Sequence, residues 1–156
     1  MGQVHAHALR AAGIPIVGVA SSSPQNATRA AERLGIARAY ADTDELLADE
    51  AVTLVHVLTP NATHAALATR ALDSGRHVVC EKPLATTAAD ASALASRASD
   101  TGLIAAVPFV YRFHPMVRAA RERIARGETG RLLSVQGAYL QDWLLAADDD
   151  NWRVDA

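Results

Sequence analysis

Short apolar runs alternate with helical patterns along most of this chain. The runs occupy residues 14–20, 52–58 and 103–107, and a further run begins at His77. Each run is too continuously apolar to keep one face in water, which is typical of strands covered by helices on both sides. Helical patterns of roughly 10 to 15 residues separate the runs. The alternation therefore predicts an α/β fold with a parallel sheet and right-handed crossovers.

Composition and charge narrow the class of protein further. Of the 156 residues, 50% are hydrophobic but only 4% are aromatic, which suits helices lying closely on a sheet better than a β-sandwich. The formal net charge of -2 gives no broad basic field, so we expect neither a nucleic acid nor a membrane as partner. The sequence shows no membrane-span or signal-peptide pattern, and the single cysteine, Cys80, is expected to be inert. These features together predict a cytoplasmic protein.

The pattern of the chain changes after its last predicted helix, residues 114–126. Residues 132–139 alternate apolar with small or polar side chains, which is typical of a strand with one face in water. This change predicts a domain boundary near residue 128. The chain then comprises one domain over residues 1–128 and the beginning of a second, α+β domain over residues 129–156.

Polar residues follow four of the predicted strands, at the point where each strand ends. These breaks are Ser-Ser-Ser at 21–23, Thr-Pro-Asn at 59–61, Glu-Lys-Pro at 81–83 and Tyr-Arg at 111–112. The carboxyl ends of parallel strands share one edge of a sheet, where open α/β folds form their ligand crevice. Each break taken alone is more often an ordinary turn. The four together favour a ligand crevice at this edge.

Several of these motifs resemble the glucose-fructose oxidoreductase and inositol dehydrogenase (Gfo/Idh/MocA) family. The specific ones are T-P-N-x-x-H at residues 59–64 and E-K-P at residues 81–83, and either alone would be weak. Further similarity lies in M-G-Q-V-H at 1–5, Y-R-F-H-P at 111–115 and N-W-R at 151–153. The resemblance covers essentially the whole chain. It implies a doubly wound, Rossmann-type dinucleotide-binding domain in the first 128 residues.

The resemblance implies an NAD(P)-dependent oxidoreductase. Such an enzyme transfers a hydride between a nicotinamide cofactor and a secondary alcohol or ketone of a sugar, polyol or related substrate. Lys82 would be the catalytic residue, because an ammonium beside the reacting oxygen stabilises the alkoxide that forms as hydride leaves. A lysine considered alone is usually an ordinary solvent-exposed surface residue. Here Glu81 and Pro83 stand beside Lys82 at the end of a strand, and this context favours a functional role instead. The alternative function is a non-catalytic nucleotide-binding or partner-binding module on the same fold.

The resemblance also implies which residues bind the cofactor. They are Gly2, Ser21, Ser22, Thr59, Pro60, Asn61, His64, Glu81, Lys82 and Arg112. Trp152 and Arg153 are candidates for the substrate pocket, although a core tryptophan and a surface arginine are equally good interpretations. His5 and His7 are expected to be non-catalytic. No metal site is predicted, because residues 148–150 have no histidine or glutamate nearby at ligand spacing.

The choice between NADP and NAD depends on the residues after the strand predicted at 14–20. An acidic residue there would bind the ribose 2′-hydroxyl and indicate NAD. Ser21, Ser22 and Ser23 lack a carboxylate that would repel a 2′-phosphate, which favours NADP. No arginine stands among these serines, and Arg29 is one candidate for neutralising the phosphate.

Two parts of the family pattern are not found in this sequence. The G-x-G-x-x-G fingerprint of the first strand and helix is represented only by Gly2, with no strand before it. The family's D-x-x-x-H segment, whose histidine serves as acid/base, is not found either. We therefore expect a piece of a longer oxidoreductase, truncated at both ends, with a sheet that lacks its first strand. The resemblance implies that the full-length form is a homo-oligomer.

Overall fold

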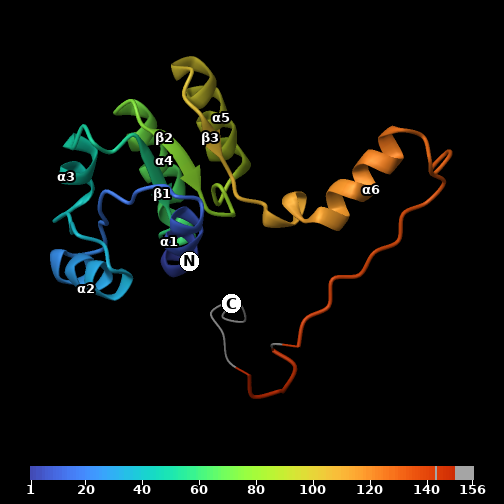
Figure 1. Ribbon diagram of the computed structural model, residues 1–156, viewed down its shortest axis with the longest axis horizontal. Helices are drawn as coiled ribbons and strands as arrows, with labels where there is room; N and C mark the ends of the chain where they lie inside the picture. The colour runs from blue at the N-terminus through green and yellow to red at the C-terminus, as the bar shows by residue number, and fades with distance from the viewer. Residues whose placement is uncertain (143, 150–156) are drawn as a thin grey trace. The chain divides into compact units, whose positions relative to one another are not determined.

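In the described part of the chain the sheet contains three parallel strands (Figure 1). The computed structural model describes residues 1–142 and 144–149. The strands are β1 (Leu54–Val57), β2 (His77–Cys80) and β3 (Ala105–Ala106), in the order β1-β2-β3. Within the ladder Val57 is paired with Cys80, and Val79 with Ala106. The predicted α/β fold with a parallel sheet is confirmed.

Helices connect the strands, and their ends follow local capping chemistry. The helix α2, for example, begins after Ser23, whose Oγ accepts a hydrogen bond from Asn26 N (3.2 Å), and ends at Gly35 with φ 61°. No helix in the described part of the chain is both long and apolar enough to cross a membrane. The helices are α1 (Gly2–Ala11), α2 (Pro24–Leu34), α3 (Thr43–Ala48), α4 (His64–Asp73), α5 (Ala88–Thr101) and α6 (Pro115–Ala125), with 3₁₀ turns η1 (Asn61–Thr63) and η2 (Val110–Phe113).

The apolar core lies between one face of the sheet and the helices α4 and α5. Val57, Val78 and Cys80 project from this face. The buried helix residues that pack with them are Ala68, Ala71, Leu72 and Leu94. Because side chains alternate along a strand, His56 projects from the opposite face, where it contacts His5 of α1. Helices therefore lie on both faces of the sheet.

Residues 14–20 are not a regular strand, which corrects the sequence-based prediction. Their pairing within the described residues is a single parallel bridge between Val19 and Ala39. Ile14 is 45% exposed and Val17 is 36% exposed, so the apolar run is not covered on both faces. A ladder needs a hydrogen-bonded neighbour along its length, and an apolar pattern does not supply one. The predicted Rossmann-type sheet is therefore reduced to the three strands β1, β2 and β3.

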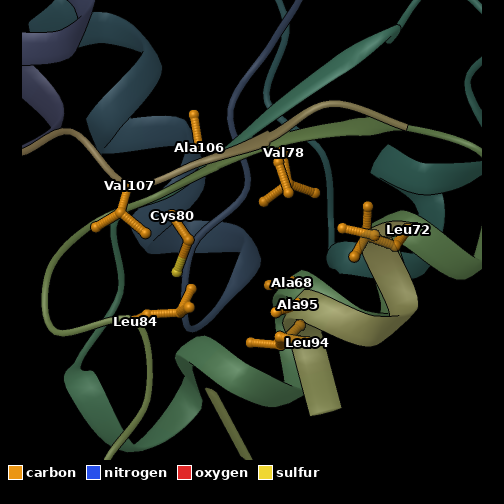
Figure 2. A pocket seen from close by; sticks show the side chains of 11 residues that line it. Ala68, Leu72, Val78, Cys80, Leu84, Leu94, Ala95, Ala106 and Val107 are labelled. Atoms are coloured by element: carbon orange, nitrogen blue, oxygen red, sulfur yellow. The ribbon is translucent and has the colours of Figure 1, made fainter. Parts of the chain in front are cut away.

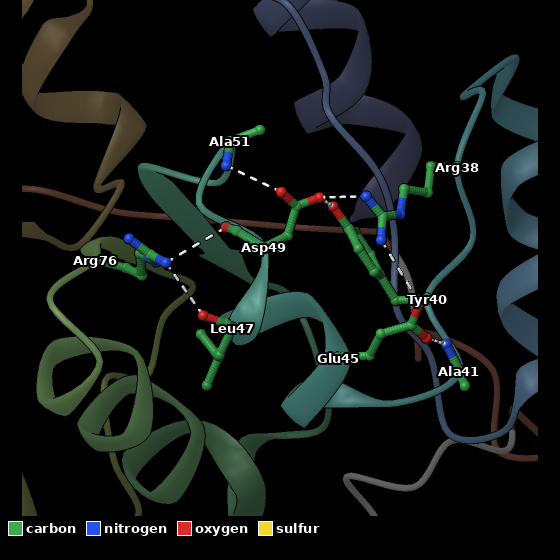
Figure 3. Close-up of polar contacts among 8 residues, drawn as sticks. All are labelled: Arg38, Tyr40, Ala41, Glu45, Leu47, Asp49, Ala51 and Arg76. Carbon is green, nitrogen blue, oxygen red and sulfur yellow. Dashed lines mark hydrogen bonds and ion pairs between the residues drawn. The ribbon is translucent and has the colours of Figure 1, made fainter.

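A buried tyrosine holds the bridged segment in place through polar contacts (Figure 3). Tyr40 is 0% exposed, and its hydroxyl donates a hydrogen bond to Asp49 Oδ2 at 2.6 Å. The Arg38 guanidinium lies 4.4 Å from the centroid of the Tyr40 ring and pairs with the same carboxylate. Burial, followed by the contact with Asp49, raises the pKa of Tyr40 to about 12. The phenol therefore stays protonated as a donor, and the ring is fixed.

Gly18→Ala is expected to destabilise the protein, because the Tyr40 ring occupies the space that a side chain would need. A Cβ at residue 18 would lie 2.4 Å from Tyr40 Cε2 and 3.1 Å from the Arg38 carbonyl oxygen. We expect a loss of about 1–3 kcal/mol of unfolding free energy, seen as a lower midpoint of urea denaturation followed by circular dichroism. Gly137→Ala is the matched control, since a Cβ there meets nothing within 4 Å. Equal midpoints for the two variants would contradict the close packing of Gly18 on Tyr40.

The chain divides into two compact units, Met1–Val110 and Tyr111–Ala156. The helix predicted over residues 114–126 is present as α6, and it belongs to the second unit. Residues 132–139, predicted as a strand, form none, and Val135 among them is 86% exposed. Alternation selects one face of a strand, but a strand also needs a partner segment, and none pairs with it in the described residues. The two units divide before α6, whereas the predicted domain boundary near residue 128 falls after it, and the assignment of domains stays a prediction.

Candidate functional site

A buried histidine joins the two loops that follow β1 and β2. His64 is the first residue of α4 and is 1% exposed. Its Nε2 lies 2.8 Å from the Thr59 carbonyl oxygen, and its Nδ1 lies 2.7 Å from the Pro83 carbonyl oxygen. The ring therefore ties the Thr-Pro-Asn loop to the Glu-Lys-Pro loop. Direct contact of His64 with a cofactor stays a prediction, and both ring nitrogens already have backbone partners.

The strand ladder brings the same two loops together. The amide of Glu81 donates a hydrogen bond to the Val57 carbonyl oxygen at 3.0 Å, one step beyond the last paired residues. Thr59, Pro60 and Lys82 are exposed at this edge, and Asn61 is half-buried. With His64 and Glu81 included, the structure therefore brings six of the sequence-predicted site residues to the carboxyl edge of β1 and β2.

Lys82 is held through its backbone amide, and the residue is exposed. It is the only lysine of the sequence. Apart from the histidines, all the other basic side chains are arginines. Its amide donates a hydrogen bond to Glu81 Oε2 at 3.0 Å. In the described parts of the chain its ammonium forms no ion pair. The compact charge of this residue is therefore available to a ligand at the edge of the sheet.

Glu81 is buried, and both of its carboxylate oxygens have partners. It is 6% exposed. Its Oε2 accepts the Lys82 amide, and its Oε1 lies 3.1 Å from His5 Nε2. His5 Nδ1 in turn lies 2.8 Å from His56 Nδ1. A buried carboxylate needs partners of this kind. The successive contacts link His56 of β1 to His5 of α1, His5 to Glu81, and Glu81 to the backbone of Lys82.

The protons in this chain of contacts follow from the partners of each atom. The Glu81 carboxylate accepts only, so His5 donates through Nε2–H and, in its neutral form, accepts at Nδ1. In that form of His5, His56 donates through its Nδ1–H. The Nε2 atom of His56 is buried and has no partner in the described structure. Burial, followed by the charge of His5, lowers the pKa of His56. His56 is therefore neutral at pH 7.

The helix α1 has its N-terminal end at this edge, since His5 near its start contacts Glu81. Gly2 is its first residue, and a Cβ there would meet only Leu34 Cδ1, at 4.0 Å. The first amides of a helix have no partner within the helix and favour phosphate. A helix N-terminus, the Lys82 ammonium and the exposed Thr59 fit the diphosphate and nicotinamide ribose of a dinucleotide.

A polar hollow lies beside the start of α2. Ser22 Oγ accepts a hydrogen bond from Asn26 Nδ2 at 3.0 Å. Ser21 lines the hollow, which has a volume of about 330 Å³. The other lining residues are Asn26, Arg29, Ala30 and Arg33. The structure thus places Ser21 and the sequence-predicted Arg29 together, and it adds Asn26 and Arg33, which the sequence analysis did not identify.

Arg112 is an exposed residue of η2 in the second unit, and its role stays a prediction. Trp152 and Arg153 lie outside the described residues. Among the residues that are described, no group of three or more His, Cys, Asp or Glu side chains is arranged to hold a metal ion.

An apolar hollow of about 280 Å³ is lined by residues of β2, β3 and α5 (Figure 2). Leu84, Leu94 and Val107 are among its lining residues, and Cys80 also lines it. Burial, followed by the nearby charge of Glu81, raises the pKa of the Cys80 thiol to about 11, so the thiolate that would react is scarce. The hollow has no polar side chain to orient a nucleotide, and the polar loops of the site do not line it.

The contacts of His5 with His56 and Glu81 were not predicted from the sequence. A signal was available, because His56 stands within the apolar run 52–58. A polar ring inside a buried strand needs a partner, which could have been sought among the other histidines. The expectation that His5 is non-catalytic stays a prediction.

The parallel sheet with helices on both faces, and polar loops joined at its carboxyl edge, define a dinucleotide-binding domain of the Rossmann class. The model of the oxidoreductase family with an NAD-binding Rossmann fold, GFO_IDH_MocA, matches residues 1–109. The chain therefore belongs to the Gfo/Idh/MocA family, as the sequence motifs predicted.

Sugar dehydrogenases are among the relatives of this chain. The levoglucosan dehydrogenase of Pseudarthrobacter phenanthrenivorans is 37% identical over 86% of the chain and 35% of its own length. The D-xylose 1-dehydrogenase (NADP(+)) 2 of Haloferax volcanii is 36% identical over 88% of the chain and 41% of its own length. A solved levoglucosan dehydrogenase, in complex with NADH and levoglucosan, matches with a TM-score of 0.79 at 32% identity, over 84% of the chain and 38% of the solved chain. The chain thus spans less than half the length of these relatives.

Proposed function

We propose that this chain is the cofactor-binding part of an NAD(P)-dependent oxidoreductase. The enzyme would act on a secondary alcohol or ketone of a sugar, polyol or related compound. The observation that carries this proposal is the His64 ring, which ties the loop of Thr59 to the loop of Lys82. The tie fixes the backbone of both loops at one edge of the sheet, which is where a dinucleotide binds in folds of this kind.

Lys82 is proposed as the catalytic residue. When bound, the nicotinamide cofactor supplies the hydride acceptor or donor. The Lys82 ammonium would donate a hydrogen bond to the reacting oxygen and stabilise the negative charge that develops there. Glu81 supports this role by holding the Lys82 amide, and His5 holds Glu81 from the other side. The use of lysine at this one position, in a chain that otherwise uses arginine, supports a requirement for a compact charge.

The proposed substrate class rests on the relatives and not on a described pocket. Their names include levoglucosan, D-xylose and scyllo-inositol, which are all cyclic polyols or sugars. A hydroxyl-bearing ring carbon is common to these compounds. We therefore propose a sugar or polyol as the substrate of the whole protein.

Because Lys82 is the only lysine, its ammonium can be observed directly. Reductive methylation with ¹³C-formaldehyde labels two amines, Lys82 and the amino terminus, which gives an internal control. Addition of NADH or NADPH is expected to shift the NMR signal of Lys82 and leave that of the terminus in place. Dissociation constants between about 1 µM and 1 mM are expected from such titrations.

Two other outcomes of this titration are informative. A chain shown to be folded by circular dichroism that binds neither cofactor would contradict the proposed function. Cofactor binding by the whole protein without turnover on a panel of sugars and polyols would favour the second candidate, a non-catalytic nucleotide-binding or partner-binding module.

A further inference from the structure

The polar hollow beside α2 contains two arginines that have no acidic partner among the described residues. Arg29 and Arg33 are four residues apart on α2, so their side chains lie on the same face of the helix. Neither guanidinium forms an ion pair within residues 1–142 and 144–149. Other arginines of the described chain, such as Arg38 and Arg97, do pair with carboxylates. The hollow therefore keeps two uncompensated positive charges.

The groups that line the hollow match a phosphate monoester. Two guanidinium groups can each donate two parallel hydrogen bonds to phosphate oxygens. The Ser21 hydroxyl and the Asn26 amide add further polar groups, and no carboxylate lines the hollow. A volume of about 330 Å³ is ample for such a group. A site that selects a free ribose hydroxyl would instead present an acidic side chain.

The position of the hollow relative to the fold indicates which phosphate of a dinucleotide could reach it. Ser21 directly follows residues 14–20, the segment that runs parallel to residues 38–40 through the Val19 bridge. In doubly wound folds the chain at this point contacts the adenosine ribose, whose 2′-oxygen carries the phosphate that distinguishes NADP from NAD. We propose that the hollow binds the 2′-phosphate of NADP(H), with Arg29 and Arg33 as the residues that determine cofactor specificity. This inference rests on the proposed function.

The inference is tested by nucleotide binding, without any need for turnover. Isothermal titration compares 2′,5′-ADP with 5′-AMP, and NADPH with NADH, on the unmodified chain and on Arg29→Gln and Arg33→Gln. The unmodified chain is expected to bind the 2′-phosphorylated member of each pair at least about tenfold more tightly. Each variant is expected to lose about tenfold in affinity for that member while its affinity for 5′-AMP and NADH is unchanged. Arg118→Gln, an exposed arginine of α6, is the matched control and should behave as the unmodified chain.

The outcomes separate this inference from the proposed function. Equal affinity of the unmodified chain for NADPH and NADH, or variants that keep its preference, would overturn the phosphate site and leave the oxidoreductase proposal standing. A loss of affinity that affects 5′-AMP and 2′,5′-ADP equally would also overturn it, since the arginines would then act on the fold or on adenosine. A folded chain that binds none of the four nucleotides would overturn both proposals.

Discussion

Replacement of Lys82 by alanine is expected to lower kcat by about 10²- to 10³-fold, the effect of removing a donor that stabilises charge in the transition state. The measurement uses a chimera in which this chain replaces the matching stretch of a full-length levoglucosan dehydrogenase. The affinity for cofactor is expected to change much less than kcat, because the backbone of the loops that would hold the dinucleotide is fixed by His64 and not by the lysine side chain. The loss should therefore fall on kcat.

Two control variants test whether activity needs the ammonium of Lys82 itself or only a positive charge somewhere in the protein. Lys82→Arg keeps a positive charge but spreads it over a planar group, so we expect it to recover only part of the activity. Arg97→Ala removes a positive charge from α5, where it pairs with Asp73 on the surface, and should leave kcat unchanged. Turnover of Lys82→Ala close to that of the unmodified chimera would show that Lys82 has been given the wrong role.

Replacement of His64 by alanine is expected to have the second large effect, on stability and on cofactor binding together. The change removes a ring that is 1% exposed and leaves the carbonyl oxygens of Thr59 and Pro83 without their partner. We expect the unfolding free energy to fall by about 2–4 kcal/mol, from the cavity and from the lost contacts of the ring with these carbonyl oxygens. Urea denaturation measures the stability, and titration with NADH and NADPH measures the binding, which should weaken as the two loops separate.

His7→Ala is the matched control for this variant. His7 is an exposed residue of α1, so its removal should change neither the urea midpoint nor the affinity for cofactor. If His64→Ala were as stable as His7→Ala and bound cofactor as tightly as the unmodified chain, the bridge between the loops would not be what organises the site.

The sequence predicted well those helices and strands whose formation depends mainly on residues close together in the chain. The apolar run at 52–58 and the run beginning at His77 became β1 and β2, and the patterns between and after them became α4 and α5. The helices have clear ends, such as Gly102 with φ 66° after α5. Capping and periodicity act over a few residues, so they can be recognised in the sequence alone.

The predictions that were wrong depended on a distant partner. Residues 14–20 carry an apolar pattern, yet only the Val19 bridge joins them to another segment. Residues 132–139 alternate as a strand should, but no described segment pairs with them. In both cases the side-chain pattern was real, but the described residues supply no hydrogen-bonded neighbour along the length of the segment. A sequence pattern says nothing about which neighbour is present.

The sequence by itself determined the class of fold, the family through its two paired motifs, and the edge of the sheet at which polar loops gather. Tertiary structure alone decided how that edge is held together, through the bridge of His64 to Thr59 and Pro83 and the contacts of Glu81 with His5. It also decided that Arg29 and Arg33 line one hollow with Ser21. The physical reason is that periodicity and turn chemistry are properties of neighbouring residues, whereas a buried polar atom can be satisfied by any residue that the fold brings within about 3 Å of it.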